Sequence, residues 1–296
     1  MWSTDMSKVV SFINYKGGVG KTTLAVEIAA ALAYHRGKKV LLVDADPQTN
    51  ATFYLISEED WDVWQKNKGT LKNIFDNYLE GRDTDINELI IKDLEVSSRT
   101  PNLHLLPSHI ELIHIDLKLA GISGSRGIRA KGLLKKALEK VKQNYDYVII
   151  DCPPNLNLVT QNSIVASDSF IIVLKPEFLS TIGIALILRV INDIVREIND
   201  EFQSFGFREE FTGPEFSGMI FNFVKYLSGG TRSQEVVINE VKRQYPGKVF
   251  KSFLSESVKL AERPVEKIPI SISGLASDRN YENQLKSIVE EFLQRV

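Results

Sequence analysis

The sequence predicts an α/β fold in which a doubly wound, mostly parallel sheet is flanked by helices. Short apolar runs alternate along the chain with segments of helical periodicity, a pattern typical of parallel strands joined by helices. A glycine-rich loop at residues 14–23 stands between the first apolar run and the first helical segment. Polar side chains directly follow several runs, and such sheets bind ligands beyond the carboxyl ends of their strands. One site could therefore gather the loop and these side chains.

The apolar runs that predict strands are short and bounded by polar or turn residues. They are Val9–Ile13, Val40–Val43, Leu103–Leu106, Tyr147–Asp151, Phe170–Leu174 and Met219–Phe221. Helices are predicted where apolar residues recur on one face. In chain order these segments are Leu24–Leu32, Leu133–Val141, Ser180–Asn199, Ser233–Gln244 and Tyr281–Val296. Because no repeat or linker interrupts this order, we expect a single domain over residues 1–296, with residues 1–7 flexible.

Residues 52–100 form a more polar, variable segment with weak helical patterning. Between Ile56 and Thr100 there are 11 acidic and 6 basic residues. We expect short helices and loops beside the sheet here, because the apolar residues are too sparse for a further buried strand.

The composition excludes several classes of protein. A hydrophobic content of 43% over 296 residues is ordinary for a globular protein with a sizeable core. Cys152 is the single cysteine, which excludes a disulfide framework and any cysteine-rich iron–sulfur or zinc site supplied by one chain. The sequence shows no signal segment and no run of 18 apolar residues, so we expect a cytoplasmic protein without a membrane anchor.

The charge is nearly balanced overall but uneven along the chain. The net charge of −2 argues against a globally basic nucleic-acid binder. However, Lys118–Lys142 holds 8 basic and 1 acidic residue, and Lys225–Lys267 holds 9 basic and 5 acidic residues. Such local asymmetry can mark an anion-binding face that the total conceals.

The glycine-rich loop predicts a phosphate-binding site. Its glycines let backbone N–H groups approach a phosphate chain, and the helix that follows adds a favourable dipole. Lys21 is placed to reach the outer phosphates of ATP, and the Thr22 hydroxyl to bind Mg²⁺. The predicted nucleotide-binding residues of the loop are Gly17, Gly18, Val19, Gly20, Lys21, Thr22 and Thr23.

One departure from the common phosphate-loop pattern is informative. That pattern requires a glycine at position 15, where Tyr15 stands, and Lys16 follows it. The form Lys-Gly-Gly-Val-Gly-Lys-Thr-Thr resembles the deviant Walker A loop of the ParA/MinD family of partition and positioning ATPases. The resemblance runs from about Lys8 to the C-terminus and is weak in residues 52–100. It implies a P-loop NTPase fold, Mg²⁺-dependent ATP hydrolysis, and a homodimer that forms with ATP.

The same resemblance implies roles for the catalytic and metal-binding residues. Lys16 would cross to the phosphates of the partner subunit in a nucleotide-sandwich dimer, and Lys21 would serve its own loop. The segment Asp44–Gln48 resembles the family's switch, in which Asp46 positions the attacking water and Asp44 approaches the magnesium shell. Asp151 ends a strand of Walker B type and would hold Mg²⁺ together with Thr22.

The base-binding residues are implied in the same way. Asn222 follows the strand Met219–Phe221 and matches the family residue that contacts the adenine amino edge. An asparagine amide can both donate and accept there. Pro264 lies in a segment that resembles the family's wall against the base. Read without the family, Asn222 is a turn asparagine and Pro264 an ordinary loop proline.

Three functions compete. In the first, the dimer binds DNA non-specifically, is nucleoid-associated, and segregates a plasmid, chromosomal or protein cargo with an adaptor of the ParB type. Its predicted DNA-binding residues are Arg196, Lys242, Arg243, Lys248, Lys251 and Lys259. Phosphate contacts by such side chains give salt-dependent, sequence-independent binding. The plainer interpretation is that these basic side chains are simply solvated.

The other two functions have less support in the sequence. A MinD-like membrane-associated ATPase should end in a basic amphipathic helix, whereas the last helix here carries Glu282, Glu290 and Glu291 on its polar face. A P-loop metabolic ligase should show a second constellation for its small substrate, and none stands out.

Overall fold

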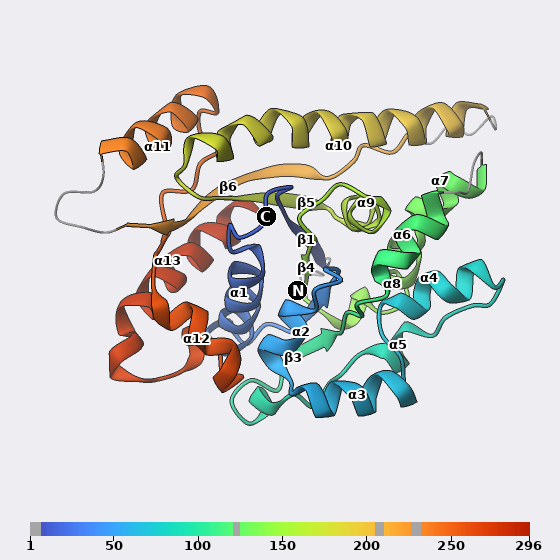
Figure 1. Ribbon diagram of the computed structural model, residues 1–296, viewed down its shortest axis with the longest axis horizontal. Helices are drawn as coiled ribbons and strands as arrows, with labels where there is room; N and C mark the ends of the chain where they lie inside the picture. The colour runs from blue at the N-terminus through green and yellow to red at the C-terminus, as the bar shows by residue number, and fades with distance from the viewer. Residues whose placement is uncertain (1–6, 121–124, 205–209, 226–231) are drawn as a thin grey trace, which may run out of the picture.

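The computed structural model describes residues 7–120, 125–204, 210–225 and 232–296 (Figure 1). Residues 1–6, most of the segment predicted to be flexible, lie outside the described residues. The backbone is organised around one seven-stranded sheet with the strand order β3-β2-β4-β1-β5-β6-β7. The strands are β1 (Lys8–Ile13), β2 (Val40–Asp44), β3 (Leu103–Leu106), β4 (Tyr147–Asp151), β5 (Ser169–Leu174), β6 (Glu215–Val224) and β7 (Leu254–Ser255).

Each neighbouring pair of strands in this sheet is parallel, which confirms the predicted fold class. Strand β1 lies between β4 and β5, so the strand order reverses beside the glycine-rich loop that follows β1. A reversal of this kind opens a crevice beyond the carboxyl ends of the strands. Strand β7 was not predicted, because two residues are too few to show a periodic pattern.

Helices cover both faces of the sheet. They are α1 (Lys21–Arg36), α2 (Asn50–Leu55), α3 (Glu58–Asn67), α4 (Lys72–Leu79), α5 (Ile86–Leu89), α6 (Leu112–Ala120), α7 (Ser125–Lys131), α8 (Leu133–Leu138), α9 (Leu158–Ala166), α10 (Phe178–Ser204), α11 (Arg232–Gln244), α12 (Val258–Glu266) and α13 (Arg279–Arg295). Short 3₁₀ segments η1 (Glu95–Ser98), η2 (Lys142–Asn144), η3 (Ile270–Ile272) and η4 (Ala276–Asp278) join them. Residues 52–100 thus contain short helices and loops, as predicted.

Alternate residues of β1 separate the core into two layers. Val10 and Phe12 pack with α1, α2, α12 and α13, whereas Val9 and Ile13 pack with α4 and α6 to α11. Figure 1 shows α1, α12 and α13 together on one side of the sheet and α10 along the other. This is the period-2 alternation of a strand that is covered on both faces.

Two helices differ from their predicted form for physical reasons. The predicted helix Leu133–Val141 ends as α8 at Leu138, and its last turn continues as the tighter η2. Helix α1 is buried on every side from Leu24 to Ala33, because it lies between the sheet, α13 and η3. A helix buried all round has no polar face, and its one acidic residue, Glu27, is fully buried.

Candidate nucleotide site

The glycine-rich loop connects β1 to α1 and requires glycine at two turns. Gly18 and Gly20 have φ angles of 70° and 82°, in the left-handed region that favours glycine. A Cβ on Gly20 would also lie 2.0 Å from the Asn222 amide nitrogen. At the front of the loop, the Asn14 amide donates to the Val173 carbonyl at 2.6 Å and accepts from the Lys16 N–H at 2.9 Å. The loop is therefore anchored to both β5 and β6.

Lys21 begins α1 and is buried beside carboxylates. Its side chain leaves 6% of its surface exposed. Burial lowers the pKa of Lys21, while the nearby charges of Asp151 and Asp46 act to raise it. A cation held among carboxylates with little water is suited to a phosphate group of higher charge density. Lys21 and Asp151 are thus brought together, as the sequence predicted.

Asp44 and Asp46 lie at the end of β2 in a network of short hydrogen bonds. Asp44 accepts from the Asp46 N–H at 3.1 Å and from the backbone N–H and hydroxyl of Thr52 at 2.8 and 2.7 Å. The Ser108 hydroxyl donates to the Asp46 carbonyl at 2.6 Å, and the Ser108 N–H to the Thr52 hydroxyl at 3.0 Å. The sequence marked Ser108 only as the turn after a strand, so its contact with the switch segment was not foreseen.

Asp151 is paired in register with Asp44 across β4 and β2, and it lacks hydrogen bonds. Both of its carboxylate oxygens are buried with no partner within the described residues. Burial raises its pKa well above the usual value, with the neighbouring Asp44 charge adding to the rise, while contact with the Thr22 hydroxyl lowers it. An orphaned carboxylate beside a threonine hydroxyl fits a divalent cation, which would supply the missing partner.

The residues present fit Mg²⁺ held jointly with a phosphate, not a cage of protein ligands. Within the described ranges there is no group of three or more His, Cys, Asp or Glu side chains that could hold a metal. Mg²⁺ commonly uses one or two carboxylates and completes its shell with waters and substrate phosphates. Asp151 and Thr22 satisfy that requirement, with Asp44 behind them.

The buried carboxylates predict that the metal-free protein loses stability as the pH rises. Burial raises the pKa of Asp44 to about 7, against 3.8 for the free side chain. Between these values the folded state holds more protons than the unfolded state, so the free energy of unfolding falls with rising pH. From pH 5.5 to pH 8 we expect Asp44 to account for a loss of about 2 kcal/mol. Urea denaturation in EDTA at both values measures it.

The matched control for this loss is Asp44→Asn, which cannot titrate. Its free energy of unfolding should vary less between the two pH values than that of the parent. An equal pH dependence in the two proteins would show that Asp44 is ionised in the folded, metal-free state.

Lys16 points away from its own loop. Its ammonium group pairs with the Glu177 carboxylate at 2.7 Å, just beyond the end of β5. Tyr15, in the place of the usual loop glycine, packs on α10, where a Cβ on Gly183 would lie 1.9 Å from the tyrosine ring. A glycine is therefore needed at 183 to admit the ring. Burial of the Tyr15 ring against the helix holds the front of the loop and leaves Lys16 at the surface, 32% exposed.

Asn222 and the Pro264 segment lie on the other side of the loop. Asn222 is fully buried, and its amide donates to the Val19 and Gly20 carbonyls at 3.1 and 3.3 Å. In this nucleotide-free form the amide is therefore committed to the loop. Pro264 lies within α12 and is half-buried, while the adjacent Arg263 is buried and paired with Asp278.

The predicted DNA-binding residues divide into two groups. The Lys248 ammonium donates to the Phe216 carbonyl at 2.7 Å, and that of Lys259 donates to Ser277 at 2.9 Å and pairs with Asp278. Both are engaged with their own chain, which the sequence could not reveal. The remaining side chains are exposed at the surface: Arg196, Lys242, Arg243 and Lys251.

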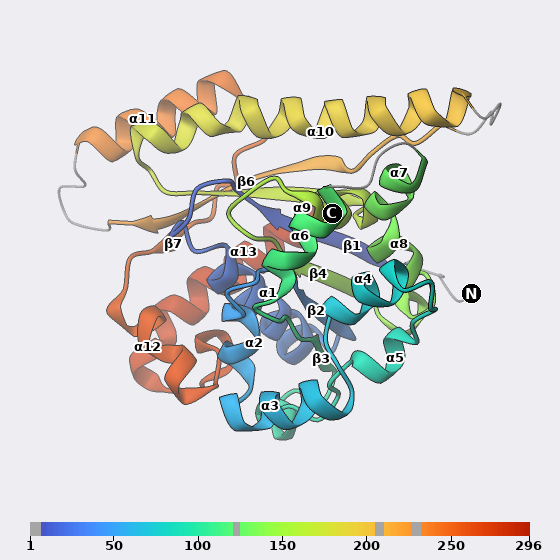
Figure 2. The same cartoon turned by 45° about the vertical axis from the view of Figure 1, so that its right-hand side comes forward.

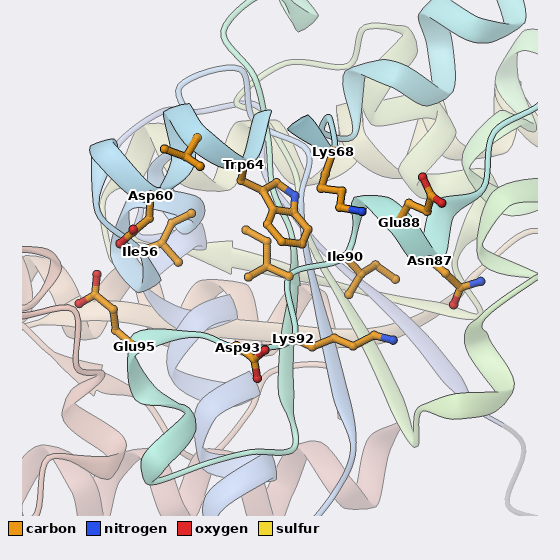
Figure 3. Close-up of a pocket in the computed structure, with 12 residues that line it drawn as sticks. Ile56, Asp60, Trp64, Lys68, Asn87, Glu88, Ile90, Lys92, Asp93 and Glu95 are labelled. Atoms are coloured by element: carbon orange, nitrogen blue, oxygen red, sulfur yellow. The ribbon is translucent and has the colours of Figure 1, made fainter. Parts of the chain in front are cut away.

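A separate pocket of about 580 Å³ lies away from the loop (Figure 3). Figure 3 shows Trp64, Ile56 and Ile90 around it, with Asp60, Asp93 and Glu95 at one side. Its lining comes from residues 56–95 and includes no residue of the phosphate loop. It is therefore distinct from the nucleotide site.

Comparison with known proteins identifies the family. Residues 7–204 match the family model described as an AAA domain. The chain is 36% identical to the sporulation initiation inhibitor protein Soj of Bacillus subtilis over 265 residues, 90% of each chain. It is 31% identical to the chromosome-partitioning ATPase Soj of Treponema pallidum over 294 residues, 98% of this chain and 100% of that protein.

The chain belongs to the ParA/Soj family of partition ATPases. A solved structure of McdA from Cyanothece has the same fold, with a TM-score of 0.73 at 22% identity, over 97% of this chain and 99% of that one. The same protein has been solved as an ATP complex. The resemblance read from the loop is thus confirmed, and this ATPase carries its phosphate loop, switch segment and Asp151 at one edge of its sheet.

No helix among the described residues of this ATPase is long and apolar enough to cross a membrane.

Proposed function

We propose that this ATPase forms a nucleotide-sandwich homodimer with ATP, binds DNA non-specifically, and segregates a cargo with an adaptor of the ParB type. The whole chain, residues 1–296, would act as one ATPase domain. The observation that carries the proposal is Lys16, which leaves an intact phosphate loop and is exposed beside Glu177. A lysine so placed can serve a partner's phosphates, as an arginine finger does.

The proposed chemistry needs positioning and charge more than covalent help. Lys21 would hold the outer phosphates of its own ATP, and Asp46 would orient the attacking water. Mg²⁺, held by Thr22 and Asp151, would neutralise charge that develops on the transferred group. Asp44, already fixed by Thr52, would keep the ligand Asp151 in register across the two strands.

Base recognition requires a local rearrangement. For Asn222 to contact adenine, its amide must release the Val19 and Gly20 carbonyls. Because those carbonyls belong to the phosphate loop, base binding and loop geometry would then be linked. Pro264 would wall the base from α12.

Lys16→Ala is expected to bind ATP but to lose both dimerisation and hydrolysis. The side chain makes no contact with its own loop beyond its backbone N–H, so the phosphate cradle stays intact. Equilibrium binding of ATP and light scattering with ATP and Mg²⁺ measure the two properties. Glu177→Ala is the matched control, because it removes the same surface ion pair while keeping the lysine. Parental turnover and dimer formation in Lys16→Ala would exclude a role in trans.

DNA binding is proposed for the outer surface of α11 and the turn after it. Lys242 and Arg243 end α11, and Lys251 follows seven residues after the helix. Figures 1 and 2 show α11 beside the first half of α10, on the side of the sheet opposite α12. A dimer would carry two such patches, so two weak phosphate-binding faces would act together. Dimerisation by ATP would thereby raise DNA affinity without altering any single contact.

Replacing Lys242, Arg243 and Lys251 with glutamate should weaken DNA binding strongly and leave ATP-driven dimerisation intact. The dependence of log K on log salt should become shallower by about 0.9 for each DNA phosphate that the variant no longer neutralises. Filter binding across a salt series measures both quantities. The control replaces Lys39, Lys66 and Lys68, which are exposed elsewhere on the surface. Unchanged affinity and slope in the α11 variant would move the DNA face elsewhere.

The structure bears on the next candidate face, the basic residues between 126 and 142. Lys131 pairs with Glu197, Lys140 with Asp83, and Lys142 with Glu139. Because these ammonium groups are already neutralised, α11 remains the stronger candidate.

Two alternatives have less support. A membrane-associated role would need a free amphipathic helix, but the apolar face of α13, with Leu285, Ile288 and Phe292, is buried in the core. A metabolic ligase would need a second substrate site beside the loop, and the pocket near Trp64 has no lining residue from the loop. A DNA-retention assay with and without ATP separates the proposed function from both.

A further inference from the structure

Glu27 is a fully buried carboxylate that the proposed chemistry does not use. It lies on α1, less than two turns after Lys21, and none of its surface is exposed. Within the described residues it forms no ion pair, so its charge is met by dipoles alone. Burying a carboxylate without a cation costs free energy, and burial raises the pKa of Glu27. A purely structural contact could be made more cheaply by apolar groups.

The hydrogen bonds of Glu27 join two segments that are far apart in sequence. Its Oε1 accepts from the Tyr54 hydroxyl at 2.8 Å and from the Ile270 N–H at 2.9 Å. Its Oε2 accepts from the Ser271 N–H at 2.8 Å. Three donors converge on two oxygens, a pattern that a glutamine could not match because its NH₂ would face a donor.

Each segment leads directly to the nucleotide site. Tyr54 belongs to α2, whose Thr52 holds Asp44 and which follows Asp46 by four residues. Ile270 belongs to η3, which follows the Pro264 helix α12. The Lys267 ammonium adds a second tie between them by donating to the Phe53 carbonyl at 2.6 Å.

We infer that Glu27 is a positioning residue that couples the switch helix α2 and the base-side segment α12–η3 to the phosphate-loop helix α1. Movement of the base-side segment on adenine binding is transmitted through one carboxylate to the helix that supports Asp44 and Asp46. The inference rests on the proposed roles of Asp46 and Pro264, and it adds a route by which occupancy of the base site sets the geometry of hydrolysis.

Tyr54→Phe tests this coupling with a minimal change. The variant loses one hydroxyl and keeps the buried ring, while Ile270 and Ser271 still hold Glu27. We expect kcat to fall about 2- to 30-fold, the range for disrupted coupling, with the Kd for ATP within about twofold of the parent. Glu27→Gln loosens both segments and should lower kcat and ATP affinity together. The double variant should have the kcat of Glu27→Gln alone, because both changes break the same hydrogen bond.

Tyr145→Phe is the matched control. It also removes a buried tyrosine hydroxyl, which bonds His104 at 2.9 Å far from the loop. It should lose comparable stability and keep the parental kcat. A parental kcat in Tyr54→Phe, an equal loss in Tyr145→Phe, or additive losses in the double variant would each overturn the inference. Asp46→Ala tests the role of the switch segment separately, so failure of the coupling and failure of the proposed function are distinguishable.

Discussion

Lys21→Ala should abolish tight ATP binding while the protein stays folded. The outer phosphates lose their main cation in a site where only 6% of the lysine surface is exposed to water. Truncating one partner of a buried charge pair costs about 2–5 kcal/mol, which corresponds to a loss of roughly 30- to 5,000-fold in affinity. Titration calorimetry with a slowly hydrolysed ATP analogue measures the change, and circular dichroism checks the fold.

Two variants sharpen the interpretation of this result. Lys39→Ala removes an exposed lysine before β2 and should bind ATP as the parent does. Lys21→Arg keeps the charge but presents a planar fork to a site shaped for an ammonium, so it should also bind poorly. ATP affinity within twofold of the parent in Lys21→Ala would show that phosphates bind elsewhere.

Asp46→Ala should bind ATP and fail to cleave it. Its carboxylate accepts a hydrogen bond from the Gln48 N–H at 2.9 Å, so the fold loses about 1 kcal/mol. Removal of a group that orients or activates water is expected to lower turnover by about 10²–10⁴-fold. The variant should therefore accumulate as an ATP-bound dimer in light scattering. Asp60→Ala, in the acidic first turn of α3, is the control, and parental turnover in Asp46→Ala would exclude it from catalysis.

The strand ends were the most predictable part of the site. Asp44, Asp151 and the loop each follow an apolar run, and parallel strands bring their carboxyl ends to one edge. The register that places Asp44 opposite Asp151 could not be predicted, because it depends on pairing between distant strands. Local pattern locates a strand's end, whereas pairing decides which side chains face each other.

Contacts between segments distant in sequence were the least predictable. Glu27 reads as a polar residue on an amphipathic helix, and only packing of η3 and α2 around α1 buries it. In the same way, Lys248 reads as a basic surface residue until β6 supplies the Phe216 carbonyl that binds its ammonium. Side-chain chemistry was visible in the sequence, but its partners were set by tertiary packing.

The dependence of DNA affinity on nucleotide tests the central claim most directly. DNA retention should be measured for Asp46→Ala with ATP and Mg²⁺, with ADP and Mg²⁺, and without nucleotide, at one fixed salt concentration. The proposed switch predicts tight, sequence-independent retention with ATP and weak retention in the other two states, since two α11 patches act together only in the dimer. Equal retention in all three states, with the dimer confirmed by light scattering, would contradict it.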